Sequence, residues 1–138
     1  MSARAIFITK SDMDRLIDLI EGIREYSKKS NASLDMLEQV LNRGTLVDPE
    51  KVPPDVVTMN SRVSITDMDS GEKKTYSLVF PSNAKIDENK LSILAPLGIA
   101  LLGYRTGDII EWKAPSGIKN LMINEVIYQP ESFGQFDM

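Results

Sequence analysis

The segment that decides the fold of this chain reads Ala95-Pro-Leu-Gly-Ile-Ala-Leu-Leu-Gly-Tyr-Arg-Thr-Gly-Asp108. Residues 96–102 are too apolar for a loop, and they have a proline at their start and Gly103 after their end. This arrangement is typical of a short buried helix. The triplet Thr106-Gly107-Asp108 has the composition of a turn that leads into an apolar run. The segment therefore predicts a short helix inside a β-rich domain.

The sequence on both sides of this segment predicts β-strands. Five runs that are rich in β-branched and apolar residues are expected to be strands: residues 56–65, 74–80, 91–94, 109–113 and 119–129. Turn residues at 67–71 and 114–117 predict two hairpins. The last segment, 129–138, is expected to be a frayed tail that Phe133 or Phe136 pins to the domain.

The N-terminal third of the chain has the period of helices instead. Hydroxyl residues are followed three positions later by Asp12 and Asp14, a typical helix start for residues 11–27. A second helix is expected over residues 33–43, with Gly44 as its C-cap. Apolar residues form one stripe on each helix: Met13, Leu16, Ile17, Ile20 and Ile23, then Leu34, Leu37, Val40 and Leu41. The two stripes predict an antiparallel helical hairpin, whose first helix of about 17 residues is roughly 25 Å long.

These elements predict an α+β chain. We expect a helical hairpin, a short coiled coil, over residues 1–48 and a proline-rich linker over 49–55, where Asp48-Pro49 and Pro53-Pro54 disfavour helix. Residues 56–138 are expected to form an antiparallel β-sheet domain with one short helix.

The composition excludes several classes of function. The 138 residues include no cysteine and no histidine, so a thiolate nucleophile, a Ser-His-Asp triad and a zinc–sulfur site are excluded. The net charge is −4, and neither half of the chain has an excess of basic residues. Direct DNA binding is therefore not expected. The sequence has no signal-peptide pattern and no apolar run of about 20 residues, so we expect a cytoplasmic protein without a membrane span.

The residues alone predict no catalytic group, no metal site and no cofactor. Asp67, Asp69 and Glu72 resemble part of a calcium loop but lie between two expected strands, which favours a solvated turn. The only tryptophan, Trp112, is either a core residue or an interface residue. The pair Lys28-Lys29, between the two helices, is either an anion-binding tip or a solvated loop.

Residues 55–63, 95–108, 115–117 and 125–130 together resemble a known domain. They are similar to the C-terminal domain of the bacterial regulators of nucleoside diphosphate kinase, within the Gre-type transcription elongation factors. The resemblance implies an FKBP-like sheet domain without prolyl isomerase activity, which docks on bacterial RNA polymerase near its secondary channel. It further implies that the helical hairpin is a finger, that the protein competes with Gre-type factors, and that any effect on the kinase level is indirect.

The sequence departs from the Gre-type pattern at the expected finger tip. Gre-type fingers carry acidic residues that hold a magnesium ion and drive transcript cleavage, whereas this tip reads Lys28-Lys29-Ser30-Asn31. Magnesium needs hard oxygen ligands, and two lysines oppose the cation. We therefore expect a protein that is not an enzyme, with Lys28 and Lys29 as candidate partner-binding residues.

A docking site is implied by resemblance at the start of the short helix. Gre-type factors have an acidic residue, a serine and a proline there, and the matching positions are Leu94, Ala95 and Pro96. These three residues are candidate polymerase contacts, although Leu94 can equally be a core residue. Two alternatives stay open: an interaction or dimerisation module that uses the helical arm, and a transcript-cleavage factor or isomerase. The oligomeric state is not determined, and a monomer is favoured.

Overall fold

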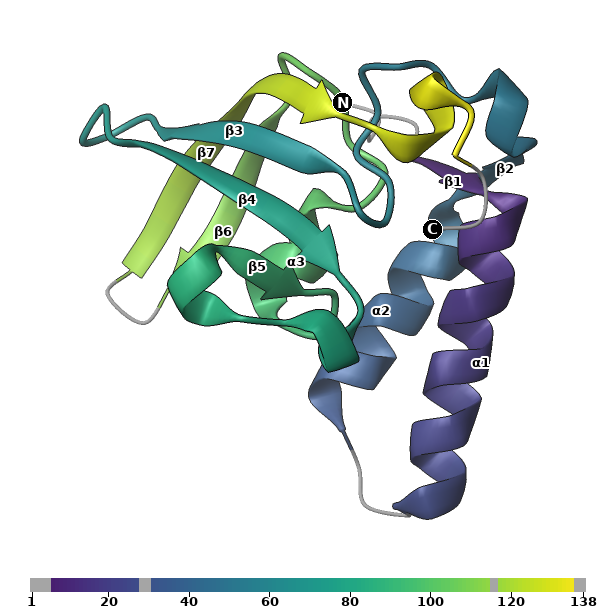
Figure 1. Cartoon of the computed structure of the whole chain (residues 1–138). Coiled ribbons are helices and arrows are strands. Elements are labelled where there is room, and N and C mark those ends of the chain that lie inside the picture. Colours follow the sequence, from purple (N-terminus) through teal and green to yellow (C-terminus); the bar gives the residue numbers. More distant parts are fainter. Residues whose placement is uncertain (1–5, 28–30, 115–116, 136–138) are drawn as a thin grey trace.

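The computed structural model describes residues 6–27, 31–114 and 117–135. Two antiparallel helices, α1 (Lys10–Tyr26) and α2 (Ala32–Arg43), lie beside a curved sheet, as Figure 1 shows. Both helices begin with a side-chain cap: Thr9 accepts from the Asp12 N–H, and Asn31 accepts from the N–H groups at the start of α2. The predicted helical hairpin is confirmed. Within the described ranges, no helix combines the length and the apolar character that crossing a membrane requires.

The main sheet has five strands in the order β5-β4-β3-β7-β6. The strands are β3 (Arg62–Asp67), β4 (Lys73–Val79), β5 (Lys90–Ser92), β6 (Ile109–Ala114) and β7 (Gly117–Tyr128). The α+β class is confirmed, but the sheet is mixed rather than antiparallel, because β5 pairs parallel with β4. Two 3-10 turns, Pro81–Asn83 and Ile86–Glu88, carry the chain back so that Lys90, the first residue of β5, lies opposite Ser77 in the second half of β4. The predicted turn at 114–117 includes residues 115 and 116, which lie outside the described residues.

A second, two-stranded sheet was not predicted. Strand β1 (Phe7–Thr9) runs into α1, and strand β2 (Thr45–Val47) follows α2 directly, so the helical hairpin brings the two strands side by side in parallel. The segment expected to be a linker therefore follows a strand, and it contains a 3-10 turn, Pro49–Lys51. The division of the chain at residue 48 stays a prediction.

The strand expected over residues 56–65 begins only at Arg62. Val56, Val57 and Met59 are buried, as a strand would bury them, but Asn60 has a φ of 66° that interrupts extended backbone. The Ser61 hydroxyl accepts from the Thr58 N–H at 2.9 Å and fixes this turn. The predicted strand is therefore confirmed for residues 62–65 and wrong for residues 56–61, where apolar composition reflects burial and not strand structure.

The expectation of a frayed C-terminal tail is wrong for residues 129–135. Gln129 is buried and donates to the carbonyl oxygens of Pro53 and Val56, each at 2.8 Å. A 3-10 turn, Pro130–Phe133, follows, and Phe133 stacks on Tyr128 with ring centroids 5.1 Å apart. Phe136, the other predicted anchor, lies outside the described residues.

The helical hairpin and the sheet share one hydrophobic core. The core contains buried residues from every part of the fold: Leu16 and Ile20 of α1, Leu34, Leu37 and Leu41 of α2, Leu101 of the short helix α3 (Pro96–Leu101), and Val63, Leu78 and Ile123 of the sheet. Most of both predicted stripes is thus buried or partly buried within the chain, but Ile17 of the first stripe is exposed, and Leu19, which lies off that stripe, packs against the core instead. The base and middle of the arm pack against the sheet domain, whereas its far end, where Tyr26 is exposed, projects beyond the sheet (Figure 1).

Two glycines let α3 approach its neighbours closely. A Cβ atom on Gly98 would overlap the carbonyl oxygen of Ser92 at the end of β5. Gly103 has a φ of +83°, and a Cβ atom there would overlap the side chain of Ile6. Gly98 and Gly103 therefore allow α3 to pack closely against β5 and Ile6.

The close approach at Gly98 predicts opposite effects for two glycine-to-alanine changes. Gly98→Ala should lower the free energy of unfolding by about 1–3 kcal/mol, because a backbone carbonyl has to move. Gly22→Ala, in α1 with no atom within 4 Å of the added Cβ, should raise it by about 0.5–1 kcal/mol. Urea unfolding of both variants tests the pair, and a stable Gly98→Ala protein would contradict the packing described here.

Candidate functional site

The predicted docking residues lie together at the surface where α3 begins. Leu94 and Ala95 are half-buried and Pro96 is exposed. The Leu94 N–H donates to the Ser92 hydroxyl at 3.0 Å, which fixes the backbone before the helix. Leu94 packs against the core and also reaches the surface, so the two interpretations of this residue are compatible.

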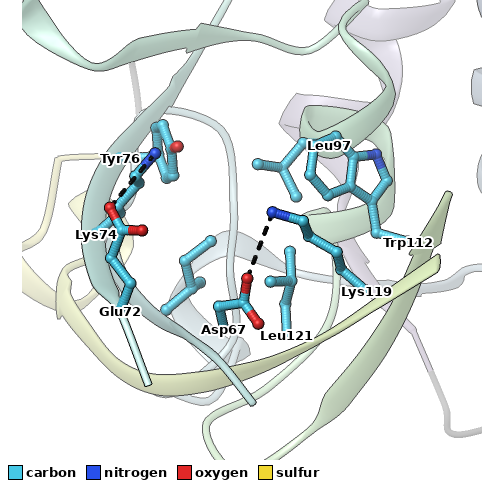
Figure 2. A pocket seen from close by; sticks show the side chains of 9 residues that line it. Asp67, Glu72, Lys74, Tyr76, Leu97, Trp112, Lys119 and Leu121 are labelled. Atoms are coloured by element: carbon cyan, nitrogen blue, oxygen red, sulfur yellow. Dashed lines mark ion pairs between the residues drawn. The ribbon is translucent and has the colours of Figure 1, made fainter. Parts of the chain in front are cut away.

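A small hollow lies between the sheet and α3. Leu97, the residue that follows Pro96, forms part of its wall. The volume of the hollow is about 70 Å³, room for two or three water molecules. In Figure 2, Tyr76 lies across the hollow from Leu97 and Trp112. Ile65 and Leu121 also line the hollow, so its interior is mainly apolar.

Charged side chains surround the mouth of this hollow. Lys119 lies 3.4 Å from Asp67, and Lys74 lies 3.8 Å from Glu72 (Figure 2). The Asp69 N–H donates to Asp67 at 2.9 Å, and this bond, together with Lys119, holds the pKa of Asp67 below its ordinary value. Asp67 therefore serves the predicted hairpin turn. The pair of Lys74 and Glu72 is exposed and contributes little to stability, so this part of the rim can rearrange at low cost, whereas Asp67 is mostly buried and held by the turn.

Trp112 combines the two roles that the sequence left open. It is half-buried, packs against the core and forms a wall of the hollow. Its indole nitrogen is buried, and it has no hydrogen-bond partner among the described residues. The hollow thus has an aromatic wall beside the predicted docking residues.

The helical arm is cross-linked near its far end. Arg24 donates to Glu38 and to Asp35, both at 2.9 Å, and this joins the end of α1 to the start of α2. The bond from Arg24 holds the pKa of Glu38 below its ordinary value. Lys28 and Lys29 lie outside the described residues.

The carboxylates nearest the tip do not fit a Gre-type magnesium site. Glu25 is exposed on α1, and Asp35 is already bound to Arg24. In the described part of the chain, no group of three acidic side chains is placed to hold a metal ion. The Asp35 oxygen that accepts from Arg24, and both oxygens of Glu38, are then engaged by the guanidinium and compete with any cation for the same lone pairs.

Two buried carboxylates were not recognised as a pair from the sequence. Asp12 accepts from the Met59 N–H at 3.0 Å and from Arg15, whose guanidinium lies 5.1 Å from the centre of the Phe80 ring. Glu131 accepts from the Thr58 hydroxyl at 2.7 Å. The sequence indicated Asp12 as part of a helix start. It did not indicate the bond to Met59, which is 47 residues further along the chain.

Burial raises the pKa of both Asp12 and Glu131 above their ordinary values. Carboxyl groups with perturbed pKa values are candidates for catalysis when they face a cleft. Here both carboxyl groups bind groups of the protein itself, and neither lines a hollow described for this chain. We interpret them as structural links that join α1 and the C-terminal turn to the segment before β3.

The fold and the sequence both match a class of transcription factors. The family model for the C-terminal domain of the transcription elongation factors GreA/GreB matches residues 52–128. This range spans more than half of the chain and includes α3, the hollow and the predicted docking residues. The chain belongs to the GreA/GreB family, and it is a Gre-related transcription factor.

Two relatives match over nearly the whole chain. The regulator of nucleoside diphosphate kinase from Escherichia coli K12 is 39% identical over 140 residues, which cover 99% of this chain and 98% of the relative. A solved GreA/GreB structure from Nitrosomonas europaea is 43% identical, covers 89% of this chain and 99% of its own, and superposes with a TM-score of 0.75. GreA from Rhodospirillum rubrum is 36% identical over 96 residues, 70% of this chain and 61% of GreA. The resemblance inferred from the motifs is confirmed.

The raised pKa of Glu131 predicts a pH-dependent effect of its removal. Because the folded state holds this proton more tightly, Glu131 contributes less to stability as the pH rises from about 4.5 through the raised pKa. Glu131→Gln retains the oxygen that accepts from Thr58 and cannot ionise. The variant should match the natural protein at pH 4 and be more stable at pH 7.5 in urea unfolding. Glu125→Gln, at an exposed position, is the control, and an equal effect of Glu131→Gln at both pH values would contradict the interpretation.

Proposed function

We propose that this protein binds bacterial RNA polymerase near its secondary channel and competes there with Gre-type factors, without stimulating transcript cleavage. The observation that carries the proposal is the family match over residues 52–128, which contains the complete α3 segment and its surroundings. Relatives in this family are named transcription elongation factors, and such factors act on RNA polymerase. Polymerase is thus the partner class that the family favours.

The proposed contact surface consists of Leu94, Ala95, Pro96 and the hollow next to them. Its centre is apolar and includes an aromatic residue, Trp112, and charged residues surround it. Interfaces commonly have an apolar, aromatic centre that excludes water and a polar rim. The exposed pair of Lys74 and Glu72 costs little to break, so a partner with complementary charges can replace it.

In this proposal, the helical arm acts by occupying space. The arm shares its core with the sheet, so docking through α3 also sets the direction of the arm. The sequence between the helices contains two lysines and no carboxylate, and Asp35 pairs with Arg24. These charges are consistent with an arm that occupies the secondary channel without holding a magnesium ion for transcript cleavage. Lys28 and Lys29 are proposed as a second contact with the polymerase.

The relative from Escherichia coli is named a regulator of nucleoside diphosphate kinase. For this protein, we propose that any effect on the kinase is indirect. A factor that competes at the polymerase changes transcript levels, and kinase abundance follows. A stable complex between the two purified proteins would contradict this part of the proposal.

Substituting Leu94 tests the docking surface directly. Leu94→Asp should weaken binding to bacterial core RNA polymerase at least about tenfold, because it places a charge at the centre of an apolar contact. Binding of the labelled natural protein should also be lost when a Gre-type factor is added in excess. Fluorescence anisotropy measures both effects.

The matched control is Leu46→Asp, the same substitution at an exposed position on β2. It should bind as the natural protein does. Because Leu94 is half-buried, circular dichroism of each variant checks the fold, and the exposed Pro96→Arg provides a second test with little effect on the core. Full binding by a folded Leu94→Asp and by Pro96→Arg would exclude this surface, and stimulation of transcript cleavage in a stalled complex would exclude the non-catalytic assignment.

A further inference from the structure

The outer face of the sheet carries a row of polar side chains on four neighbouring strands. Strand pairing places Lys90 of β5 opposite Ser77 of β4, Ser77 opposite Arg62 of β3, and Arg62 opposite Tyr128 of β7. Residues paired in this way project to the same face of a sheet. Their neighbours in sequence, such as Leu78 and Val63, point to the core instead. The row therefore lies on the face opposite the hollow at α3.

The row lines an open depression of about 520 Å³. Asn60 and Asn83 complete its polar wall, and Val79 and the ring of Tyr128 contribute apolar surface. Neighbouring strands are about 4.8 Å apart, so the backbones of Lys90 and Arg62 are separated by roughly 10 Å, with Ser77 between them. Two long cationic side chains at this separation can both reach a tetrahedral anion that lies over the serine hydroxyl.

The charges in the depression are of one sign. None of the seven residues that line it is acidic, although the whole chain has a net charge of −4. Among the described residues, no carboxylate lies within ion-pair distance of Arg62, which is exposed. Lys90 has one acidic neighbour, Glu88, at 3.6 Å, and Glu88 lies closer to Lys85, at 2.7 Å. Lys90 would therefore have to give up only the longer of the two ion pairs of Glu88 in order to bind an anion.

We propose that Arg62, Ser77 and Lys90 form a binding site for a small phosphate-type anion. The guanidinium of Arg62 donates two hydrogen bonds to phosphate oxygens, the Ser77 hydroxyl donates a third, and Lys90 turns from Glu88 to neutralise the remaining charge. The Tyr128 hydroxyl already donates to Gln135, so Tyr128 forms a wall of the site rather than a ligand. Because the site lies on the opposite face of the sheet from α3, a bound anion does not need the polymerase contact.

The test is a titration of the full-length protein with inorganic phosphate and with pyrophosphate, followed by calorimetry and by amide chemical shifts. Pyrophosphate should bind more tightly than phosphate, since it carries more charge, and the shifts should centre on β3, β4 and β5. Arg62→Gln and Lys90→Gln should each weaken binding by about fivefold or more, and added salt should weaken binding too.

Two further variants separate this site from general surface charge. Lys73→Gln removes a cation from the same strand and face as Ser77 but outside the depression, and it should leave binding unchanged. Glu88→Gln removes the carboxylate that competes for Lys90, and it should tighten binding by about twofold or more. All four substitutions are at the surface, and unfolding curves check that each variant is folded.

Three results would overturn the proposal. The first is no binding of pyrophosphate at millimolar concentration. The second is an equal loss of binding in Lys73→Gln and Arg62→Gln, which would indicate nonspecific charge. The third is Arg62-dependent binding of a single-stranded oligonucleotide without any binding of pyrophosphate, which would assign the phosphate to nucleic acid rather than to a small anion.

Discussion

One buried carboxylate, Asp12, joins the helical arm to the rest of the protein. It lies in the first turn of α1, and it accepts the backbone N–H of Met59 in the segment that leads into β3. Removing the charge from water is costly, and burial raises the pKa of Asp12 accordingly. The N–H of Met59 and the guanidinium of Arg15 offset that cost. Without Asp12, a buried N–H would lose its partner, so the position of α1 and the path of the chain before β3 are set together.

The shared core lies beside this link. With α1 held against Met59, Leu16 and Ile20 of α1 pack into one core with Leu34, Leu37 and Leu41 of α2, the sheet and α3. Gly98 then lets α3 lie against β5, which places Leu94, Ala95 and Pro96 at the surface beside the aromatic wall of the hollow. The sheet consequently has two different faces, one that carries the proposed polymerase contact and one that carries the cationic row.

The sequence predicted the features that depend on local periodicity. The helical hairpin, the helix at Pro96 and the hairpin of β3 and β4 each follow from spacing, caps or turn residues over short distances. Strand β1 has three residues and no period, and the parallel pairing of β5 depends on the 3-10 turns before it. The links from Asp12 to Met59 and from Gln129 to Val56 span long stretches of chain, so no local signal indicates them. The row from Lys90 to Arg62 requires the register of three strands, which composition does not give.

Because the arm and the sheet domain share one hydrophobic core, they should unfold as one cooperative unit. The chain provides two separate probes of it: its only tryptophan, Trp112, lies in β6, whereas α1 and α2 supply most of the helical circular dichroism signal. Equilibrium unfolding in urea, followed by tryptophan fluorescence and by far-ultraviolet circular dichroism, should give coincident transitions. Loss of the helical signal at a clearly lower urea concentration than the fluorescence change would show that the arm unfolds independently, and it would contradict a single cooperative core.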